Sequence, residues 1–389
     1  MSPRVASAEH VLRARLKRPV SGAKEVVAAW LRHADIQING SRPWDIQVRD
    51  ERLWNAILGE GSLGVGEAYM NGWFDAERLD ELLFHAIRAS IDTRLPSMRE
   101  VLLALKSRLI NLQTPSRSFK VGEQHYDVGD DLYTLMLDPR LIYSCGYWKN
   151  APNLAMAQEA KLDLICRKLG LKPGMRVLDI GCGWGGAAQF AAERYGVEVT
   201  GVTISKNQAA SARERCQHLP VNIIFDDYRS VQGTYDRIYS IGMFEHVGER
   251  NHGVFFETTR RLLASDGLML LHTIGNRQTQ KANDPWIEKY IFPHSKIPSR
   301  RQIDSASEGI WTIEDWHEFG VDYDRTLMAW SDNFERAWPT LKDRYGERFH
   351  RMWHFYLMAS AASFRSRNNQ LWQVVMSPEG IVGGYQEVR

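Results

Sequence analysis

The sequence predicts an α/β fold, in which a doubly wound, mostly parallel sheet follows a smaller and mostly helical N-terminal domain. Three observations lead to this prediction. The chain has 389 residues, more than one average domain of about 100 to 200 residues. Apolar residues recur with helical spacing in parts of roughly the first 110 residues, and helix-like and strand-like segments alternate regularly after about residue 150.

The N-terminal region is expected to form helices near residues 25–33, 51–58 and 79–89. The segment 59–74 is rich in glycine and aromatic residues, and we interpret it as a loop or a helix junction. No P-loop lysine follows it, which disfavours a phosphate cradle. Residues 111–120 are polar, lack periodicity and contain Pro115, as linkers do. We therefore predict one domain over residues 1–112, with a linker that extends to about residue 124, and a second domain over residues 113–389.

The second domain is predicted to contain helices at residues 153–169, 187–195 and 207–218 and strands at residues 176–180, 197–203, 221–225, 237–241 and 268–273. Residues 371–376 are expected to add an antiparallel edge strand. In a doubly wound sheet, ligands bind beyond the carboxyl ends of the strands. The residues that follow the strands should therefore meet at one site, and these are residues 181–183, Thr203, Asp226, Asp227, 242–245 and 272–275.

A glycine-rich turn joins a strand to a helix in the stretch MRVLDIGCGWGGAAQF, residues 175–190. Such a turn lets a nucleoside cofactor approach the backbone closely. A dinucleotide would require an acidic residue at the end of the next strand, about twenty residues after the glycines, and none is present. Polar residues TISKNQ, 203–208, stand there instead and suit ribose or a methionine end. We therefore expect S-adenosylmethionine, with a tight turn in an ordinary α/β domain as the plainer alternative.

Composition excludes several classes of protein. No apolar run approaches the roughly 20 residues that span a bilayer, which argues against an integral membrane protein. No secretory signal is recognisable, so we expect a cytoplasmic location. The four cysteines are far apart with no C-x-x-C pair, which argues against a zinc site or a disulfide framework. A net charge of +2 without a long basic tract makes nucleic acid a poor candidate partner.

Ionisable residues follow two of the predicted strands. Glu245 and His246 come after the strand at 237–241, and His272 ends the strand at 268–273. A carboxylate beside an imidazole can act as acid or base, or bind a small third molecule. The plainer interpretation ties each side chain to a nearby backbone group. Cys145 comes before the first predicted strand of the sheet. Taken alone, a cysteine of this kind is more often a buried apolar residue than a functional thiol.

Motifs along nearly the whole chain resemble those of the cyclopropane-fatty-acyl-phospholipid synthase family. They are GEGSLGVGEAYMNGWF, HYDVGDDLYTLMLDP, YSCGYW, KPGMRVLDIGCGWGG, GVTISKNQ, GMFEHVG, DPWIEKYIFP, DWHEFGVDYDRTLMAW and LWQVV, in family order. The resemblance implies a Rossmann-like methyltransferase domain and methyl transfer from S-adenosylmethionine to a cis double bond of a phospholipid acyl chain. The cation left by that transfer loses a proton from the new methyl group as the three-membered ring closes.

The resemblance also implies site residues. The base is bicarbonate, and the matching ligands here are Cys145, Glu245, His272, the backbone of Ile274, and Tyr323. The residues expected to contact S-adenosylmethionine are Tyr143, Ser144, Asp179, Gly181, Cys182, Gly183, Thr203, Ser205, Gln208 and Asp227. No metal is implied. A homodimer formed through the N-terminal domain is implied, and so is peripheral association with the inner face of a bacterial membrane, where the unsaturated phospholipid lies.

Two other functions stay open at this point. A small-molecule N-methyltransferase or a mycolic-acid-type modifying enzyme would share the glycine turn, but such relatives generally lack the N-terminal domain. A non-catalytic lipid-binding protein on the same fold would keep an apolar pocket and lose the bicarbonate ligands. The presence of both the N-terminal motifs and the bicarbonate ligands favours the phospholipid enzyme.

Overall fold

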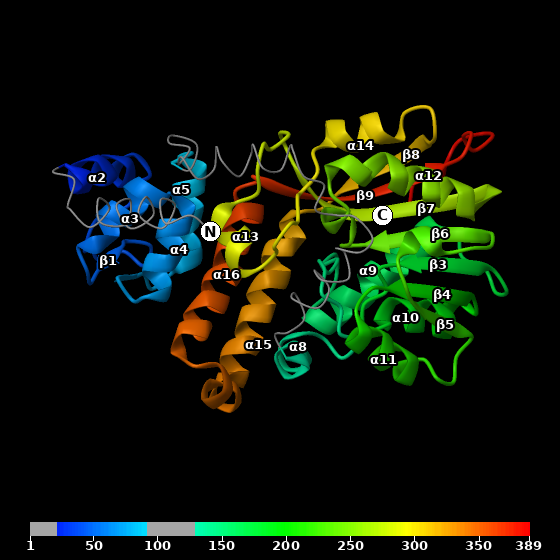
Figure 1. Ribbon diagram of the computed structural model, residues 1–389, viewed down its shortest axis with the longest axis horizontal. Coiled ribbons are helices and arrows are strands. Elements are labelled where there is room, and N and C mark those ends of the chain that lie inside the picture. The colour runs from blue at the N-terminus through cyan, green and yellow to red at the C-terminus, as the bar shows by residue number, and fades with distance from the viewer. Residues whose placement is uncertain (1–21, 92–128) are drawn as a thin grey trace, which may run out of the picture.

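The computed structural model describes residues 22–91 and 129–389. The predicted linker at residues 111–120 lies outside the described residues, and so does the predicted boundary between the two domains. The division into domains therefore stays a prediction. Figure 1 shows the first helices at one end of the molecule, the large sheet at the other end, and two long helices between them.

The sheet has seven strands in the order β5-β4-β3-β6-β7-β9-β8. Their bounds are β3 Arg176–Ile180, β4 Glu198–Thr203, β5 Val221–Phe225, β6 Tyr235–Ile241, β7 Leu263–Asn276, β8 Thr312–Glu318 and β9 Asn369–Ser377. The pairs among β3 to β7 are all parallel, and β9 is antiparallel to both β7 and β8. The strand order reverses between β3 and β6, which is the switch point where a doubly wound sheet binds ligands. The predicted fold class is confirmed.

Helices cover both faces of this sheet. They are α9 Leu154–Lys168, α10 Gly186–Tyr195, α11 Lys206–Arg215, α12 His252–Leu262 and α14 Arg300–Ser307. On β3, Val177 packs with residues of α9 and α10, whereas Leu178 packs with residues of α12 and α14. Successive strand residues point to opposite faces, so an apolar strand such as β3 is buried on both sides. The helices α9, α10 and α11 and the parallel strands fall close to the predicted segments, whereas α12 and α14 were not predicted.

Two predicted elements differ from the structure. Residues 371–376 do form a strand within β9, but β9 lies inside the sheet and β8 is the edge strand. The residues of β8, TIEDWHE, are exposed or only partly buried in the structure. A strand of this kind needs no apolar run, and it was not predicted. Segment 59–74 is not simply a loop, since α4 runs over Ser62–Met70. Its glycines allow close packing: a Cβ on Gly64 would lie 2.0 Å from the Ala56 carbonyl oxygen.

The N-terminal part is mostly helical, as predicted. It consists of α2 Ala23–His33, α3 Arg52–Glu60, α4, α5 Leu79–Arg88 and a two-stranded sheet of β1 Gln47–Val48 and β2 Phe74–Asp75. These helices share one hydrophobic core with α13 Pro285–Tyr290, α15 Val321–Tyr345 and α16 Glu347–Arg365. The long pair α15 and α16 was not predicted. It stands between the N-terminal helices and the sheet in Figure 1.

Arg365, the last residue of α16, joins three helices through ion pairs. Its Nε and Nη2 donate to the two carboxylate oxygens of Asp324 on α15, both at 2.9 Å. Its Nη1 donates to Asp80 at 2.7 Å and to Glu81 at 2.6 Å, both on α5. Asp80 is buried, so these bonds compensate a carboxylate that has left water. The N-terminal helices are thus held to the long pair by charge as well as by apolar packing.

Candidate active site

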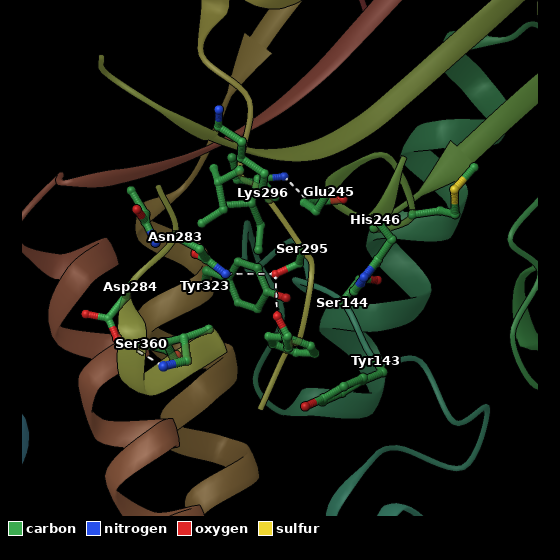
Figure 2. A pocket seen from close by; sticks show the side chains of 18 of the residues that line it. Tyr143, Ser144, Glu245, His246, Asn283, Asp284, Ser295, Lys296, Tyr323 and Ser360 are labelled. Carbon is green, nitrogen blue, oxygen red and sulfur yellow. Dashed lines mark hydrogen bonds between the residues drawn. The ribbon is translucent and has the colours of Figure 1, made fainter. Parts of the chain in front are cut away.

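A cavity of about 1120 Å³ lies at the carboxyl ends of the central strands and continues between the sheet and the N-terminal helices. All ten residues expected to contact S-adenosylmethionine line it: Tyr143, Ser144, Asp179, Gly181, Cys182, Gly183, Thr203, Ser205, Gln208 and Asp227. Figure 2 draws Ser144, Glu245 and Tyr323 around this space. Segments far apart in the chain therefore form one continuous wall.

The glycine turn after β3 forms the first part of the wall. Gly181 and Gly183 have φ of 85° and 54°, in the left-handed region that glycine adopts without strain. The N–H groups of Gly181 and Cys182 both donate to the Val202 carbonyl of β4, at 2.9 and 3.0 Å. These bonds fix the turn against the neighbouring strand. The backbone is therefore held ready for a ligand to approach, as the sequence pattern predicts.

The second part of the wall follows β4. Ser205 caps α11 by accepting from the Gln208 N–H at 3.4 Å, and the Thr203 hydroxyl donates to the Gln208 side chain at 3.1 Å. Beyond β5, Asp227 is paired with Arg229 at 2.6 Å. These bonds keep short polar side chains at the sheet edge in fixed positions, where they can meet hydroxyl groups of a nucleoside.

Two carboxylates in the cavity are shielded from water. Burial raises the pKa of Asp179 to about 7, although the neighbouring Tyr239 hydroxyl and the charge of Lys161 oppose the rise. Burial likewise raises the pKa of Glu245 to about 7, although the Ile274 N–H, which donates to Glu245 Oε1 at 2.6 Å, opposes the rise. Oε2 of Glu245 has no partner among the described residues. Both groups are thus open to a ligand that donates a hydrogen bond.

His272 lies on β7, two residues before the Ile274 that bonds Glu245, and is fully buried. Burial, together with the charges of Lys161 and Lys168, holds the pKa of His272 well below its usual value, so the ring is neutral. The amide nitrogen of Gln373 donates to Nδ1 at 3.3 Å, which leaves the ring proton on Nε2. Nε2 has no partner among the described residues. A donor and an acceptor, His272 and Glu245, therefore both face the cavity.

The predicted anion ligands do not all reach the cavity. Glu245, His272, Ile274 and Tyr323 line it, and the Tyr323 ring lies 4.4 Å from that of Phe364. Cys145 is not among the lining residues. Its Sγ donates to the carbonyl of Gly146 at 3.1 Å, and burial raises its pKa well above the usual value. The Ile274 N–H is already used by Glu245. The structure thus places four of the five predicted residues on the cavity wall, and Cys145 is not among them.

Several lining residues were not predicted. Lys161 of α9 is fully buried and reaches the cavity. Gln158 and Lys168 of the same helix are buried as well, so no local pattern distinguished Lys161 as a cavity residue. The apolar wall opposite the sheet was also missed. It is formed by residues of the N-terminal part, among them Trp30, Ile57, Val65, Leu83, Ile87 and Ile91. Their role depends on packing against distant elements, which no local pattern reports.

The described residues contain no group of three or more His, Cys, Asp or Glu side chains arranged to bind a metal ion. Within residues 22–91 and 129–389, no helix combines the length and the apolar character that crossing a bilayer requires.

Comparisons with known proteins agree with this geometry. The mycolic acid cyclopropane synthetase family matches residues 113–374. A cyclopropane-fatty-acyl-phospholipid synthase of Escherichia coli (strain K12) is 51% identical over 360 residues, which cover 92% of this chain and 94% of that protein.

Two solved structures share the fold. The mycolic acid cyclopropane synthase CmaA1 complexed with SAH (S-adenosylhomocysteine) and CTAB is 33% identical, with a TM-score of 0.62 over 66% of this chain and 97% of that one. Coclaurine N-methyltransferase bound to N-methylheliamine and SAH has a TM-score of 0.67 over 80% of this chain and 98% of that one. At 20% identity, this second likeness concerns the fold alone.

Proposed function

This chain belongs to the mycolic acid cyclopropane synthetase family, and from that premise we propose that it converts a cis double bond of a phospholipid acyl chain into a cyclopropane. S-adenosylmethionine supplies the carbon, and S-adenosylhomocysteine is released. The observation that carries the proposal is the continuous cavity, which joins the glycine turn to Glu245 and His272 and extends along the apolar N-terminal wall. A cofactor, a proton acceptor site and an acyl chain can therefore occupy one enclosed space.

The residues present fit S-adenosylmethionine. The turn at Gly181 and Gly183 leaves room beside the backbone, and the buried carboxylate of Asp179, which lines the cavity, suits an ammonium group. When bound, the cofactor supplies an electrophilic methyl group on a positively charged sulfur. The chain's own part is to hold that methyl near the alkene carbon, which attacks it as the carbon–sulfur bond breaks.

The residues present also fit a small oxyanion such as bicarbonate. Oε2 of Glu245 can accept the O–H of that anion, while Nε2 of His272 can donate to it. Bicarbonate held there would supply the base that takes a proton from the transferred methyl group as the ring closes. In our proposal the protein excludes water, which would otherwise capture the cation. Cys145 does not line the cavity, so we give the largest part to Glu245.

The apolar wall supports an acyl chain as the substrate. Ile57 and Val65 of the first helices and Leu83 and Ile87 of α5 face the cavity, and buried apolar surface favours a hydrocarbon by about 25 cal/mol per Å². A phospholipid would have to enter from a bilayer, so we also propose that the enzyme works in the cytoplasm at the inner membrane surface. Sedimentation with anionic vesicles tests that proposal, and an enzyme left wholly in the supernatant would contradict it.

On family resemblance we propose a homodimer that forms through the N-terminal domain. Light scattering would reject it by giving the mass of a single chain.

Mass spectrometry of phospholipid acyl chains tests the proposed reaction. The enzyme is incubated with S-adenosylmethionine, bicarbonate and vesicles of a cis-monounsaturated phospholipid. We expect acyl chains heavier by one CH₂ unit that have lost the double bond. Glu245→Gln should lower the rate by about 100-fold or more, because the base is no longer held in place and acid–base catalysis is typically worth that much. Glu249→Gln makes the same chemical change outside the cavity and should stay active. Unchanged lipid, or methylation of free amines instead, would contradict the proposal.

A further inference from the structure

Helix α9 holds the segment 142–145 with two buried polar side chains, one helical turn apart. Gln158 Nε2 donates to the carbonyl of Ser144 at 2.7 Å, and Lys161 Nζ donates to the Ser144 hydroxyl at 3.0 Å. Both side chains have zero exposure to solvent. A lysine buried in this way costs free energy unless its charge has partners. Its position on the cavity wall therefore calls for an explanation beyond packing.

The direction of the hydrogen bonds shows what Ser144 can offer. An ammonium group has donors only, so the Ser144 oxygen accepts from Lys161. The single O–H proton of Ser144 is then left for an acceptor in the cavity. The positive charge behind the oxygen makes that O–H a stronger donor, and the bond from Gln158 fixes the backbone of the same residue. Ser144 is thus prepared to bind a negatively charged oxygen.

Asp179 offers the opposite polarity on the same cavity wall. Its carboxylate lines the cavity and, beside the neighbouring Tyr239 hydroxyl, keeps lone pairs that can accept from a ligand. Burial lowers the pKa of Lys161 to about 8, while the nearby carboxylates Asp138 and Asp179 oppose that change. The two groups therefore stabilise each other's charged forms. A ligand that carries one carboxylate and one ammonium group complements this pair of sites.

We propose that Lys161 is a positioning residue that orients the Ser144 hydroxyl toward the carboxylate of the amino-acid end of S-adenosylmethionine, with Asp179 facing the ammonium group. This rests on the proposed function, because it takes the cofactor as given. It assigns a task to a side chain that neither contacts the reacting atoms nor serves the apolar core. Lys161 acts through Ser144, so the two should behave as one unit.

Lys168 provides a matched control on the same helix. It is also buried, and its Nζ pairs with Asp315 at 3.1 Å. It does not line the cavity. Replacing either lysine by methionine removes a buried charge of the same kind and should lower stability in both variants. Only the change at Lys161 should alter how the cavity recognises a carboxylate.

Calorimetric titration of the full chain tests the inference. The ligands are S-adenosylhomocysteine and its decarboxylated analogue, which lacks only the carboxylate. We expect the wild type to prefer the carboxylate ligand. Lys161→Met and Ser144→Ala should each reduce that preference by about ten- to hundredfold, as loss of a charge-assisted hydrogen bond does. The double variant should lose no more than either single one. Lys168→Met should keep the preference within about twofold.

An unchanged preference in a folded Lys161→Met protein would overturn the inference, and so would equal losses in Lys161→Met and Lys168→Met. If Lys161→Met does not fold, Ser144→Ala decides, because it removes one oxygen atom and leaves the helix intact. A preference retained in Ser144→Ala would overturn the inference while leaving the proposed function in place. A wild type that binds neither ligand would contradict the proposed function itself.

Discussion

The two walls of the cavity are built by different means. On the sheet side, the groups that face the ligand lie in turns that directly follow β3, β4 and β6 or, like His272, on β7 itself. Backbone bonds such as those of Gly181 and Cys182 to Val202 hold the turns. On the opposite side, the wall consists of side chains from helices more than 200 residues apart in sequence, joined through Arg365. The first wall is set by local chain direction, and the second by tertiary packing.

Because the two walls are built differently, substitutions in them should have different effects. Alterations in the sheet-edge turns should change ligand binding with modest effects on stability, since the turns are short and their strands are secured by neighbours. Alterations at the junction of α5, α15 and α16 should affect stability first, because Arg365 pairs there with carboxylates of two other helices, and one of them, Asp80, is buried.

The largest effect is expected for Arg365→Met. This change removes the bonds of Arg365 to Asp80, Glu81 and Asp324, while Arg78 still pairs with the buried Asp80. It should lower the free energy of unfolding by about 3 kcal/mol, the scale of a lost hydrogen bond between charged groups. Arg52→Met removes an exposed pair with Asp50 and should cost less than about 1 kcal/mol. Urea denaturation measures both. Similar losses for the two variants would show that the ion pairs of Arg365 do not hold the helical wall.

A smaller effect is expected from the titration of Glu245. Its pKa in the folded protein is raised from 4.5 to about 7, so the folded state keeps a proton that the unfolded chain has lost. The contribution of protonated Glu245 to the stability of the folded state is complete below about pH 4.5, and it disappears as the pH rises through about 7. The wild type should therefore lose on the order of 2 kcal/mol relative to Glu245→Gln across that range. Chemical denaturation at several pH values measures the difference, and parallel pH curves would refute it.

The smallest change in stability is expected for two glycine variants that separate strain from steric contact. Gly181 and Gly174 have φ of 85° and 80°, so alanine at either position should cost about 1 kcal/mol. A Cβ at Gly181 would also lie 2.8 Å from side-chain atoms of Met243, whereas a Cβ at Gly174 would have no neighbouring atom within 4 Å. Gly181→Ala should therefore weaken S-adenosylhomocysteine binding at least about tenfold, and Gly174→Ala should not. Equal affinities in titration calorimetry would argue against a tightly fitted turn.

Much of the sheet and its site could be predicted from local patterns. Strand β3 lies where its short apolar run ends in glycines, and Glu245 and His272 meet because parallel strands bring their carboxyl ends to one edge. The glycines of α4 were misinterpreted as turn formers, because a sequence does not reveal that Gly64 must touch the backbone of another helix. Cys145 illustrates a related limit, since a motif lists residue types without saying which side chains reach the cavity.

The sequence by itself determined the fold class, the family and the polar groups at the sheet edge, since each depends on residues that are neighbours in the chain. Tertiary structure alone decided that β9 lies inside the sheet with β8 at its edge, that Lys161 stands behind Ser144, and that N-terminal helices close the cavity. The physical reason is that these features depend on which surfaces become buried together. The surfaces that pack together are those that minimise exposed apolar area and unpaired charge over the whole molecule, and this cannot be predicted from a short segment.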